Sequence, residues 1–182
     1  MSKYKLVVDL EATCCTNNEF PRHEMQIIEI GAVLLDSENK TLSTFSTFVK
    51  PTVNPVLTDF CKGLTTITQD QVDTAPSFNI AMTDFLNWVH EYVIAFYDFY
   101  SWGDFDKNII HRQARSLNYK NPKLDVLLSN HSNLKQIFAD KNDVKPMGVS
   151  SALKFKGLKF ENQQHRAIYD AINIAKLIDC TN

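Results

Sequence analysis

The residues best suited to chemistry are Asp9 and Glu11, which stand two apart at the end of the apolar run Leu6-Val7-Val8. Side chains alternate faces along a strand, so this spacing predicts that the two carboxylates lie side by side. Paired carboxylates repel each other unless a cation lies between them, and hard oxygen ligands suit Mg²⁺ or Mn²⁺. Short motifs also match by accident, and the alternative is a pair of solvated carboxylates at a strand end.

Further candidates recur downstream, each at the end of a strand or the start of a helix. Asp106 closes the segment Gly103-Asp-Phe-Asp106, where a helix with an apolar stripe begins. His165 and Asp170 are five residues apart, and within one helix that spacing turns through about 500° and leaves them about 140° apart. They can share a site only if His165 lies in the loop before the helix and Asp170 lies inside it. Taken alone, they indicate a surface histidine and a solvated helix residue.

The elements that must position these residues alternate between strand and helix. Apolar, β-branched segments predict strands near residues 6–11, at 27–35, at 41–50 and at about 93–102. Helices are predicted after the capping box Thr68-Gln-Asp-Gln71, from Ser77 onward, from Asp104 onward, over 150–156 with a cap at Gly157, and from about Arg166 to Asp179. Residues 118–147 predict only one short helix, from Ser132 to Asp140. The pattern is that of one α/β domain spanning residues 1–182.

Composition narrows the class of protein. The chain has 182 residues, of which 44% are hydrophobic and 22% charged, as in an ordinary globular protein with one sizeable core. No stretch is long and apolar enough to span a membrane and no signal-peptide pattern stands at the N-terminus, so we expect a cytoplasmic protein with no membrane partner. Four cysteines lack zinc-site spacing, which favours reduced thiols. The net charge of −2 provides no global basic field, so nucleic acid would need a local patch plus metal.

Together these residues resemble the DEDDh-type 3′-to-5′ exonucleases. The first motif corresponds to Asp9 and Glu11, the second to Asp106 and the third to His165 and Asp170. The resemblance is greatest to the branch that trims histone messenger RNA stem-loops, ribosomal RNA ends and small interfering RNA, and to its bacterial relatives. It extends to further segments that include Glu29-Ile-Gly-Ala-Val-Leu34, Leu57-Thr-Asp-Phe-Cys61, Leu64-Thr-Thr-Ile-Thr-Gln-Asp-Gln-Val72 and Ser101-Trp-Gly-Asp-Phe-Asp106. It covers residues 5 to 178, weakly between 118 and 147.

The resemblance implies an RNase H-like three-layer α/β fold with a central mixed five-stranded sheet. It also implies two Mg²⁺ or Mn²⁺ ions, the first bound by Asp9, Glu11 and Asp170, and the second shared by Asp9 and supported by Asp106. His165 would then accept the proton of the attacking water, as a histidine can near neutral pH. The expected reaction is hydrolysis of the last phosphodiester at an RNA 3′ end, with release of nucleoside 5′-monophosphates.

Substrate contacts follow from the same resemblance. Phe60 and Phe105 match positions that flank the terminal base, and stacking contributes roughly 1–3 kcal/mol per base. Ala12 and Thr13 are placed to touch the terminal sugar. The alternative for the two phenylalanines is core packing. Asp104 competes with Asp106 for the second-motif role, although Asp104 stands where a helix N-cap is useful.

Two basic segments invite a phosphate-binding interpretation. One comprises Lys154, Lys156 and Lys159 with interleaved Phe155 and Phe160, and the other is the pair Arg112 and Arg115. A solvated helix face explains the lysine cluster at least as well, and the arginine pair calls for the same caution.

The chain departs from the family in two respects, and two rival functions are weighed against the exoribonuclease. No residues are left for a separate nucleic-acid-binding domain, so a short or single-stranded 3′ end is expected in place of a stem-loop. Position 169, often acidic in this branch, is Tyr. One rival is a DNA exonuclease of the proofreading kind with the same five residues. The other is a non-catalytic nucleic-acid-binding module, which in this fold would normally have lost one of them.

Overall fold

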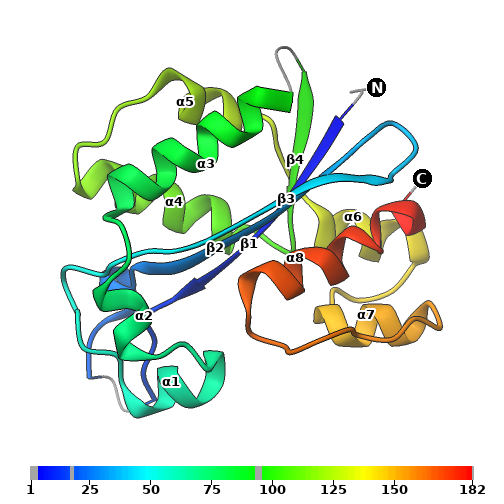
Figure 1. Cartoon of the computed structure of the whole chain (residues 1–182). Coiled ribbons are helices and arrows are strands. Elements are labelled where there is room, and N and C mark those ends of the chain that lie inside the picture. Colours follow the sequence, from blue (N-terminus) through cyan, green and yellow to red (C-terminus); the bar gives the residue numbers. More distant parts are fainter. Residues whose placement is uncertain (1–3, 17–18, 93–95, 182) are drawn as a thin grey trace.

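A mixed five-stranded sheet forms the centre of the computed structural model (Figure 1). The structure describes residues 4–16, 19–92 and 96–181, with residues 180 and 181 described by their backbone alone. The strands are β1 (Tyr4–Ala12), β2 (Ile27–Leu35), β3 (Thr41–Phe48), β4 (Tyr97–Ser101) and β5 (His131–Asn133). Their order in the sheet is β3-β2-β1-β4-β5. β2 pairs antiparallel with both β1 and β3, whereas β4 pairs parallel with β1 and β5. The predicted α/β class and five-stranded mixed sheet are confirmed.

Helices cover both faces of this sheet, which gives three layers (Figure 1). One face carries α3 (Phe78–Tyr92), α4 (Phe105–Ser116) and α5 (Pro122–Ser129), and the other carries α6 (Leu134–Asn142), α7 (Val149–Phe155) and α8 (Ala167–Ala175). Alternation along β1 sends Leu6, Val8 and Leu10 into the core under α3, α4 and α5. Val7 instead packs with residues of α6 and α8. Asp9 and Glu11 continue the Val7 side, so β1 directs them toward α8.

Two short helices close the end of the sheet where β1 finishes (Figure 1). α1 (Asp59–Thr65) and α2 (Gln69–Asp73) cover a small apolar cluster that includes Ile28 and Cys61. The predicted capping box at the start of α2 is present, because the Thr68 hydroxyl accepts from the Gln71 N–H and the Gln71 side chain accepts from the Thr68 N–H. A 3₁₀ turn, Arg22–Glu24, lies in the connection from β1 to β2. A second 3₁₀ segment, Ile178–Thr181, ends the described chain.

Several predicted boundaries are wrong. β4 begins at Tyr97 rather than near residue 93, and residues 93–95 lie outside the described part of the chain. The segment 118–147 holds α5 and β5, which were not predicted, and α6 starts at Leu134 rather than Ser132. β5 is three polar residues long and exists because it pairs with β4. α1 was not predicted, and α8 ends at Ala175 instead of reaching Asp179.

Among the described helices, none combines the length and the apolar character needed to cross a bilayer. Cys14, Cys15 and Cys61 are free thiols, whereas the side chain of Cys180 lies outside the described residues.

Gly31 in β2 marks the point where α8 lies closest to the sheet. A Cβ atom built on Gly31 would stand 2.1 Å from the carbonyl carbon of Ala167 and 2.2 Å from the amide nitrogen of Ile168. Gly31 pairs with Asp9 across the β1–β2 ladder. The missing side chain therefore lets the first turn of α8 rest on the sheet beside Asp9.

Replacing Gly31 with Ala is expected to lower the free energy of unfolding by at least about 3 kcal/mol, because the clash is with backbone that cannot rotate away. Urea unfolding followed by circular dichroism measures this change. Gly63→Ala is the matched control. Gly63 lies inside α1, and nothing lies within 4 Å of a Cβ atom built on it. A helix gains up to about 1 kcal/mol from that exchange. Equal stability of the Gly31→Ala and wild-type proteins would contradict the close approach.

Candidate active site

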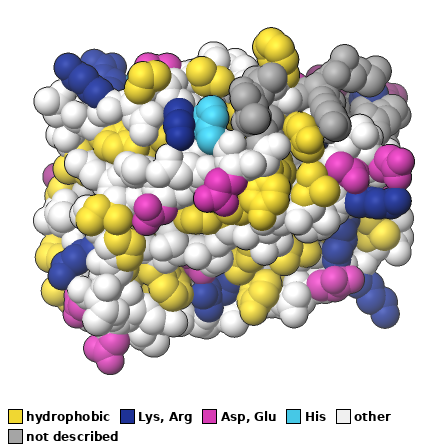
Figure 2. Space-filling view, turned by 45° about the horizontal axis from the view of Figure 1, so that its top comes forward, with side chains coloured by type: hydrophobic (Ala, Val, Ile, Leu, Met, Phe, Trp, Pro, Cys, Tyr) yellow, Lys and Arg dark blue, Asp and Glu magenta, His cyan; other side chains and the backbone are white. Residues whose placement is uncertain are grey.

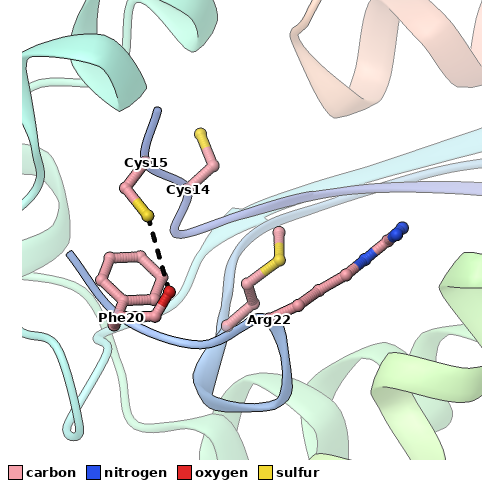
Figure 3. Close-up of a pocket in the computed structure, with 5 residues that line it drawn as sticks. Cys14, Cys15, Phe20 and Arg22 are labelled. Carbon is pink, nitrogen blue, oxygen red and sulfur yellow. Dashed lines mark hydrogen bonds between the residues drawn. The ribbon is translucent and has the colours of Figure 1, made fainter. Parts of the chain in front are cut away.

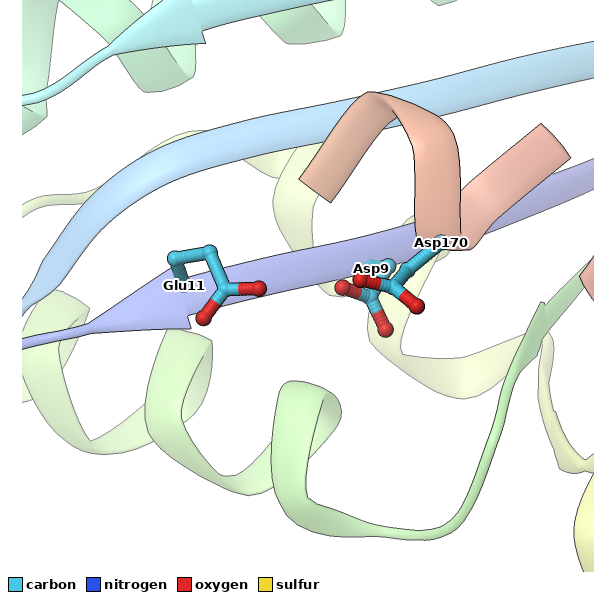
Figure 4. A group of neighbouring side chains, drawn as sticks. All are labelled: Asp9, Glu11 and Asp170. Atoms are coloured by element: carbon cyan, nitrogen blue, oxygen red, sulfur yellow. The ribbon is translucent and has the colours of Figure 1, made fainter. Parts of the chain in front are cut away.

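Three carboxylates converge where β1 passes under α8. Asp9 and Glu11 come from β1 and Asp170 comes from α8, and one oxygen from each lies within 4.8 Å of the others (Figure 4). Figure 4 shows Asp170 reaching down from its helix to lie beside Asp9, with Glu11 further along the strand. The predicted side-by-side arrangement of Asp9 and Glu11 is therefore present, and the structure adds Asp170 to it.

Asp106 lies in the first turn of α4 and is only 5% exposed. Its Oδ1 accepts a hydrogen bond from the backbone N–H of Leu10 at 3.2 Å, which fixes the carboxylate beside the strand residue between Asp9 and Glu11. Asp104 turns away: its Oδ2 accepts from the Asn133 side chain at 2.8 Å, and it makes no capping bond to α4. The choice of Asp106 over Asp104 agrees with this geometry, but the N-cap bond suggested for Asp104 is absent.

His165 lies in the loop before α8, as its spacing from Asp170 required. Its side chain is exposed and its φ is +60°, a left-handed conformation that is uncommon outside glycine. This conformation turns successive backbone N–H groups of His165 and Arg166 toward the Asp170 carboxylate, with the Arg166 nitrogen at 3.2 Å. The backbone around the histidine thus holds the acid in place.

An ion pair beneath the site anchors this loop to the sheet. Glu29 in β2 is fully buried. Its carboxylate accepts hydrogen bonds from the Nε and one Nη of Arg166, the shorter of them at 2.8 Å. The second Glu29 oxygen accepts the Ala167 N–H at 3.0 Å, one of the N–H groups that the start of α8 leaves unpaired. Glu29 and Arg166 therefore set the position from which His165 and Asp170 extend.

The carboxylates strongly oppose one another's ionisation. Burial, followed by the charges of Asp106, Asp170 and Glu11, raises the pKa of Asp9 well above its usual value. Burial and then the charge of Asp170 raise the pKa of Glu11 to about 8. Burial raises the pKa of Asp106 to about 7, against the hydrogen bonds it accepts. Burial also raises the pKa of Asp170, partly offset by its bonds from the His165 and Arg166 backbone.

This charge arrangement fits a divalent metal site. A cluster of oxygen donors whose members cannot all ionise at neutral pH must bind protons or a cation, and carboxylates prefer hard cations. Among the described residues, Asp9, Glu11 and Asp170 are the group with metal-ligand geometry, and Asp106 stands next to it. The donor set is therefore the kind that holds divalent metal, and it leaves the identity of the ion open.

The four residues predicted to contact substrate differ in how far the structure exposes them. Phe60, on α1, is 42% exposed, which is contrary to simple core packing. Phe105 is partly buried against the main core and lies beside Asp106 at the start of α4. Ala12 is 6% exposed and Thr13 2%, and the Thr13 hydroxyl already accepts the Gln26 N–H at 2.9 Å. Contact between these four residues and substrate stays a prediction.

The sequence interpretation gave no role to Gly31, Glu29 or Arg166. Glu29 and Gly31 each had a signal that could have been used. Glu29 is an acidic residue and Gly31 a glycine within an otherwise apolar β-branched run, and both features indicate an unusual environment in a buried strand. The partner of a buried Glu29 had to be a cation, yet nothing in the sequence pointed to Arg166.

Arg166→Met is expected to destabilise the fold by about 3–5 kcal/mol, because it leaves the buried Glu29 carboxylate without its cation. Denaturant unfolding measures the loss. Arg166→Met combined with Glu29→Gln should recover much of it, since the second change removes the unpaired charge. Recovery in the double variant separates loss of the ion pair from loss of packing, and no destabilisation by Arg166→Met alone would contradict the anchoring role.

Known proteins that resemble this chain are nucleases, which agrees with a carboxylate site for divalent metal. The family model described as "Exonuclease" matches residues 6–178. The chain belongs to this exonuclease family. A solved relative with high similarity is the nuclease domain of 3′hExo bound to rAMP, itself described as a DEDDh family member, with a TM-score of 0.87 and 27% identity over 97% of this chain and 90% of that one. The predicted membership of the DEDDh exonucleases and the RNase H-like fold are confirmed.

Curated relatives extend the family assignment. ERI1 exoribonuclease 2 of Xenopus laevis is 30% identical over 195 residues, which is 96% of this chain and 28% of that protein. The 3′-5′ exonuclease eri1 of Schizosaccharomyces pombe is 28% identical over 97% of this chain and 67% of that protein. The exonuclease chain therefore spans little more than a quarter of the frog relative's length and two thirds of the yeast one's.

Proposed function

We propose that this chain is a 3′-to-5′ exonuclease that hydrolyses the terminal phosphodiester of single-stranded or short-overhang RNA and releases nucleoside 5′-monophosphates. The observation that carries the proposal is the convergence of Asp9, Glu11 and Asp170 within 4.8 Å, with Asp106 fixed beside them. The match of the exonuclease model to residues 6–178 supports one exonuclease domain over residues 1–182. Relatives named as exoribonucleases favour RNA over DNA.

The carboxylates are proposed as ligands of two Mg²⁺ or Mn²⁺ ions. Asp9, Glu11 and Asp170 would hold the first. Asp9 would also bind the second, which Asp106 would support directly or through water. When bound, two such cations lower the pKa of the attacking water and neutralise the charge that grows on the leaving oxygen. Arg166 and Glu29 contribute indirectly, because they fix the start of α8 and hence the place of Asp170.

His165 is proposed to accept the proton of the attacking water. Its side chain is exposed at the end of the loop whose backbone binds Asp170, so it can approach a phosphodiester at the carboxylates without itself being a ligand. An imidazole can then pass the proton to solvent between turnovers. The left-handed backbone at His165 stores some strain, which fits a residue held in place for function.

The terminal nucleotide is proposed to lie between aromatic side chains. Phe105 adjoins Asp106, and Phe60 extends from α1, which packs beneath the end of β1. Flat aromatic faces accept any base, which suits an enzyme that removes nucleotides in succession. Ala12 and Thr13, at the end of β1, would meet the terminal sugar, where a 2′-hydroxyl distinguishes RNA from DNA.

The test uses 5′-labelled single-stranded RNA and DNA of one sequence. Wild type and His165→Ala are each incubated with Mg²⁺, Mn²⁺ or chelator, and the products are separated on a sequencing gel. We expect a ladder that shortens from the 3′ end, requires metal, is lost in the variant and is faster on RNA. Faster shortening of DNA would favour the DNA exonuclease, and binding without cleavage under any metal would favour a non-catalytic module.

A further inference from the structure

An open, basic pocket lies beside the candidate active site, between the 3₁₀ turn Arg22–Glu24 and α4. Its volume is about 500 Å³, and its lining residues are Arg22, His23, Phe105, Asn108 and Arg112. Three of these come from one face of α4, at positions i, i+3 and i+7. Among the residues that the structure describes, no acidic side chain lines this pocket. The pocket therefore combines positive charge with one aromatic face.

The two arginines leave this positive charge uncompensated. Burial and then the charge of Arg22 lower the pKa of Arg112, so the two guanidinium groups are close enough to repel each other. In the described part of the chain, neither makes an ion pair; Arg112 instead donates to the backbone oxygen of Met25 at 2.8 Å. Two like charges held together without a counter-charge are stabilised by a bound anion.

Arg22 also links the pocket to an aromatic ring. Its guanidinium carbon lies 5.7 Å from the centre of the Phe105 ring, in cation–π range. Arg22 lines a second, smaller pocket as well, together with Cys14, Cys15, Phe20 and Met25. Figure 3 shows the Arg22 side chain extending away from the two cysteines. Arg22 thus stands between two hollows along one side of the site.

The pocket adjoins the carboxylates through α4. Phe105 lines the pocket, and the next residue, Asp106, turns inward to accept the Leu10 N–H beside Asp9 and Glu11. A strand whose terminal phosphodiester lies at the carboxylates could therefore continue into this pocket. On the face drawn in Figure 2, basic side chains are scattered among acidic ones. That face therefore offers no broad basic surface to bind the RNA backbone instead of this pocket.

We propose that this pocket binds the sugar–phosphate backbone of the RNA strand upstream of the bond that is cut, with Arg22 and Arg112 contacting its phosphates. The proposal rests on the proposed function. Guanidinium groups bind phosphate oxygens through paired donors, which suits a backbone contact that ignores sequence. The Lys154–Lys159 cluster is a weaker candidate, because Lys156 is bonded to Asn142 and lies 5.9 Å from the centre of the Phe138 ring.

The experiment measures binding of a 5′-fluorescein ten-nucleotide RNA to His165→Ala protein in Mg²⁺ by fluorescence anisotropy. We expect Arg22→Gln with Arg112→Gln to raise Kd at least about tenfold and to reduce the salt slope by about 1.4, near 0.7 per phosphate contact. Binding of AMP, which reaches only the terminal site, should change less than twofold. Arg115→Gln is the matched control, because Arg115 lies one turn along α4 and does not line the pocket.

Two further variants distinguish loss of phosphate contacts from misfolding of the double Gln variant. Arg22→Gln alone is expected to raise Kd about threefold or more, and Arg22 is exposed on a short 3₁₀ turn. Arg22→Lys with Arg112→Lys should restore part of the affinity because the charge returns.

The two proposals fail in distinguishable ways. If wild type shortens RNA but the double Gln variant binds as tightly as its parent, the pocket proposal is overturned and the exonuclease remains. If no RNA is shortened yet binding still depends on both arginines, the pocket is upheld while the exonuclease fails. Absence of any RNA binding overturns the pocket proposal.

Discussion

Asp9→Asn is expected to lower the rate of RNA shortening by at least about 10³-fold, a loss of about 4 kcal/mol of transition-state stabilisation. Asp9 is the central carboxylate, because Asp106, Asp170 and Glu11 all act on its pKa. An amide is nearly the same size but brings no charge to a metal. Gel-based rates at saturating Mg²⁺ measure the loss, and Asp84→Asn, an exposed acid on α3, is the control.

The same change is expected to stabilise the metal-free fold, which separates a site residue from a structural one. At pH 8 the wild-type site without metal confines several carboxylates whose pKa values are raised by burial and by one another. Asn removes one of these charges, so Tm in chelator should rise by about 3 °C or more. An active Asp9→Asn protein, or one with lower Tm in chelator, would contradict the assignment.

Removal of metal should make stability strongly dependent on pH. The folded-state pKa is about 8 for Glu11 and about 7 for Asp106, both above the ordinary values of unfolded carboxyls. The folded state therefore binds more protons than the unfolded state at neutral pH, and unfolding free energy falls as pH rises toward these folded-state values. In chelator, Tm should drop on the order of 5 °C between pH 6.5 and pH 8.

Divalent metal should reverse this drop. A cation replaces the protons that the carboxylates lose, so saturating Mg²⁺ or Mn²⁺ is expected to raise Tm more at pH 8 than at pH 6.5. Thermal scans at both pH values, with metal and with chelator, measure the difference. Glu11→Gln is the control, because it removes one of the titrating groups and should flatten the pH dependence in chelator. The same metal effect at both pH values would argue against a carboxylate site.

Much of the fold could be predicted because local patterns agreed with burial. β2 was predicted with its observed bounds, since Ile27 to Leu35 is apolar apart from Glu29 and every residue of it is buried. The Thr68 capping box and the Gly157 turn, with φ of +72°, depend only on neighbouring residues and were also right. β5 could not be found this way, because His-Ser-Asn has no strand pattern and becomes a strand only by pairing with β4.

The sequence by itself determined the chemical inventory of the site: alternation placed Asp9 beside Glu11, and helix geometry required His165 to precede the helix that carries Asp170. Tertiary structure decided how these parts meet. α8 reaches Asp9 only because Gly31 has no side chain, and its first turn is held by the buried Glu29 and Arg166. Likewise, Arg22 and Arg112 share a pocket only because the loop after β1 lies against α4. Periodicity reports which face a residue occupies, whereas contacts between distant segments depend on how whole elements pack.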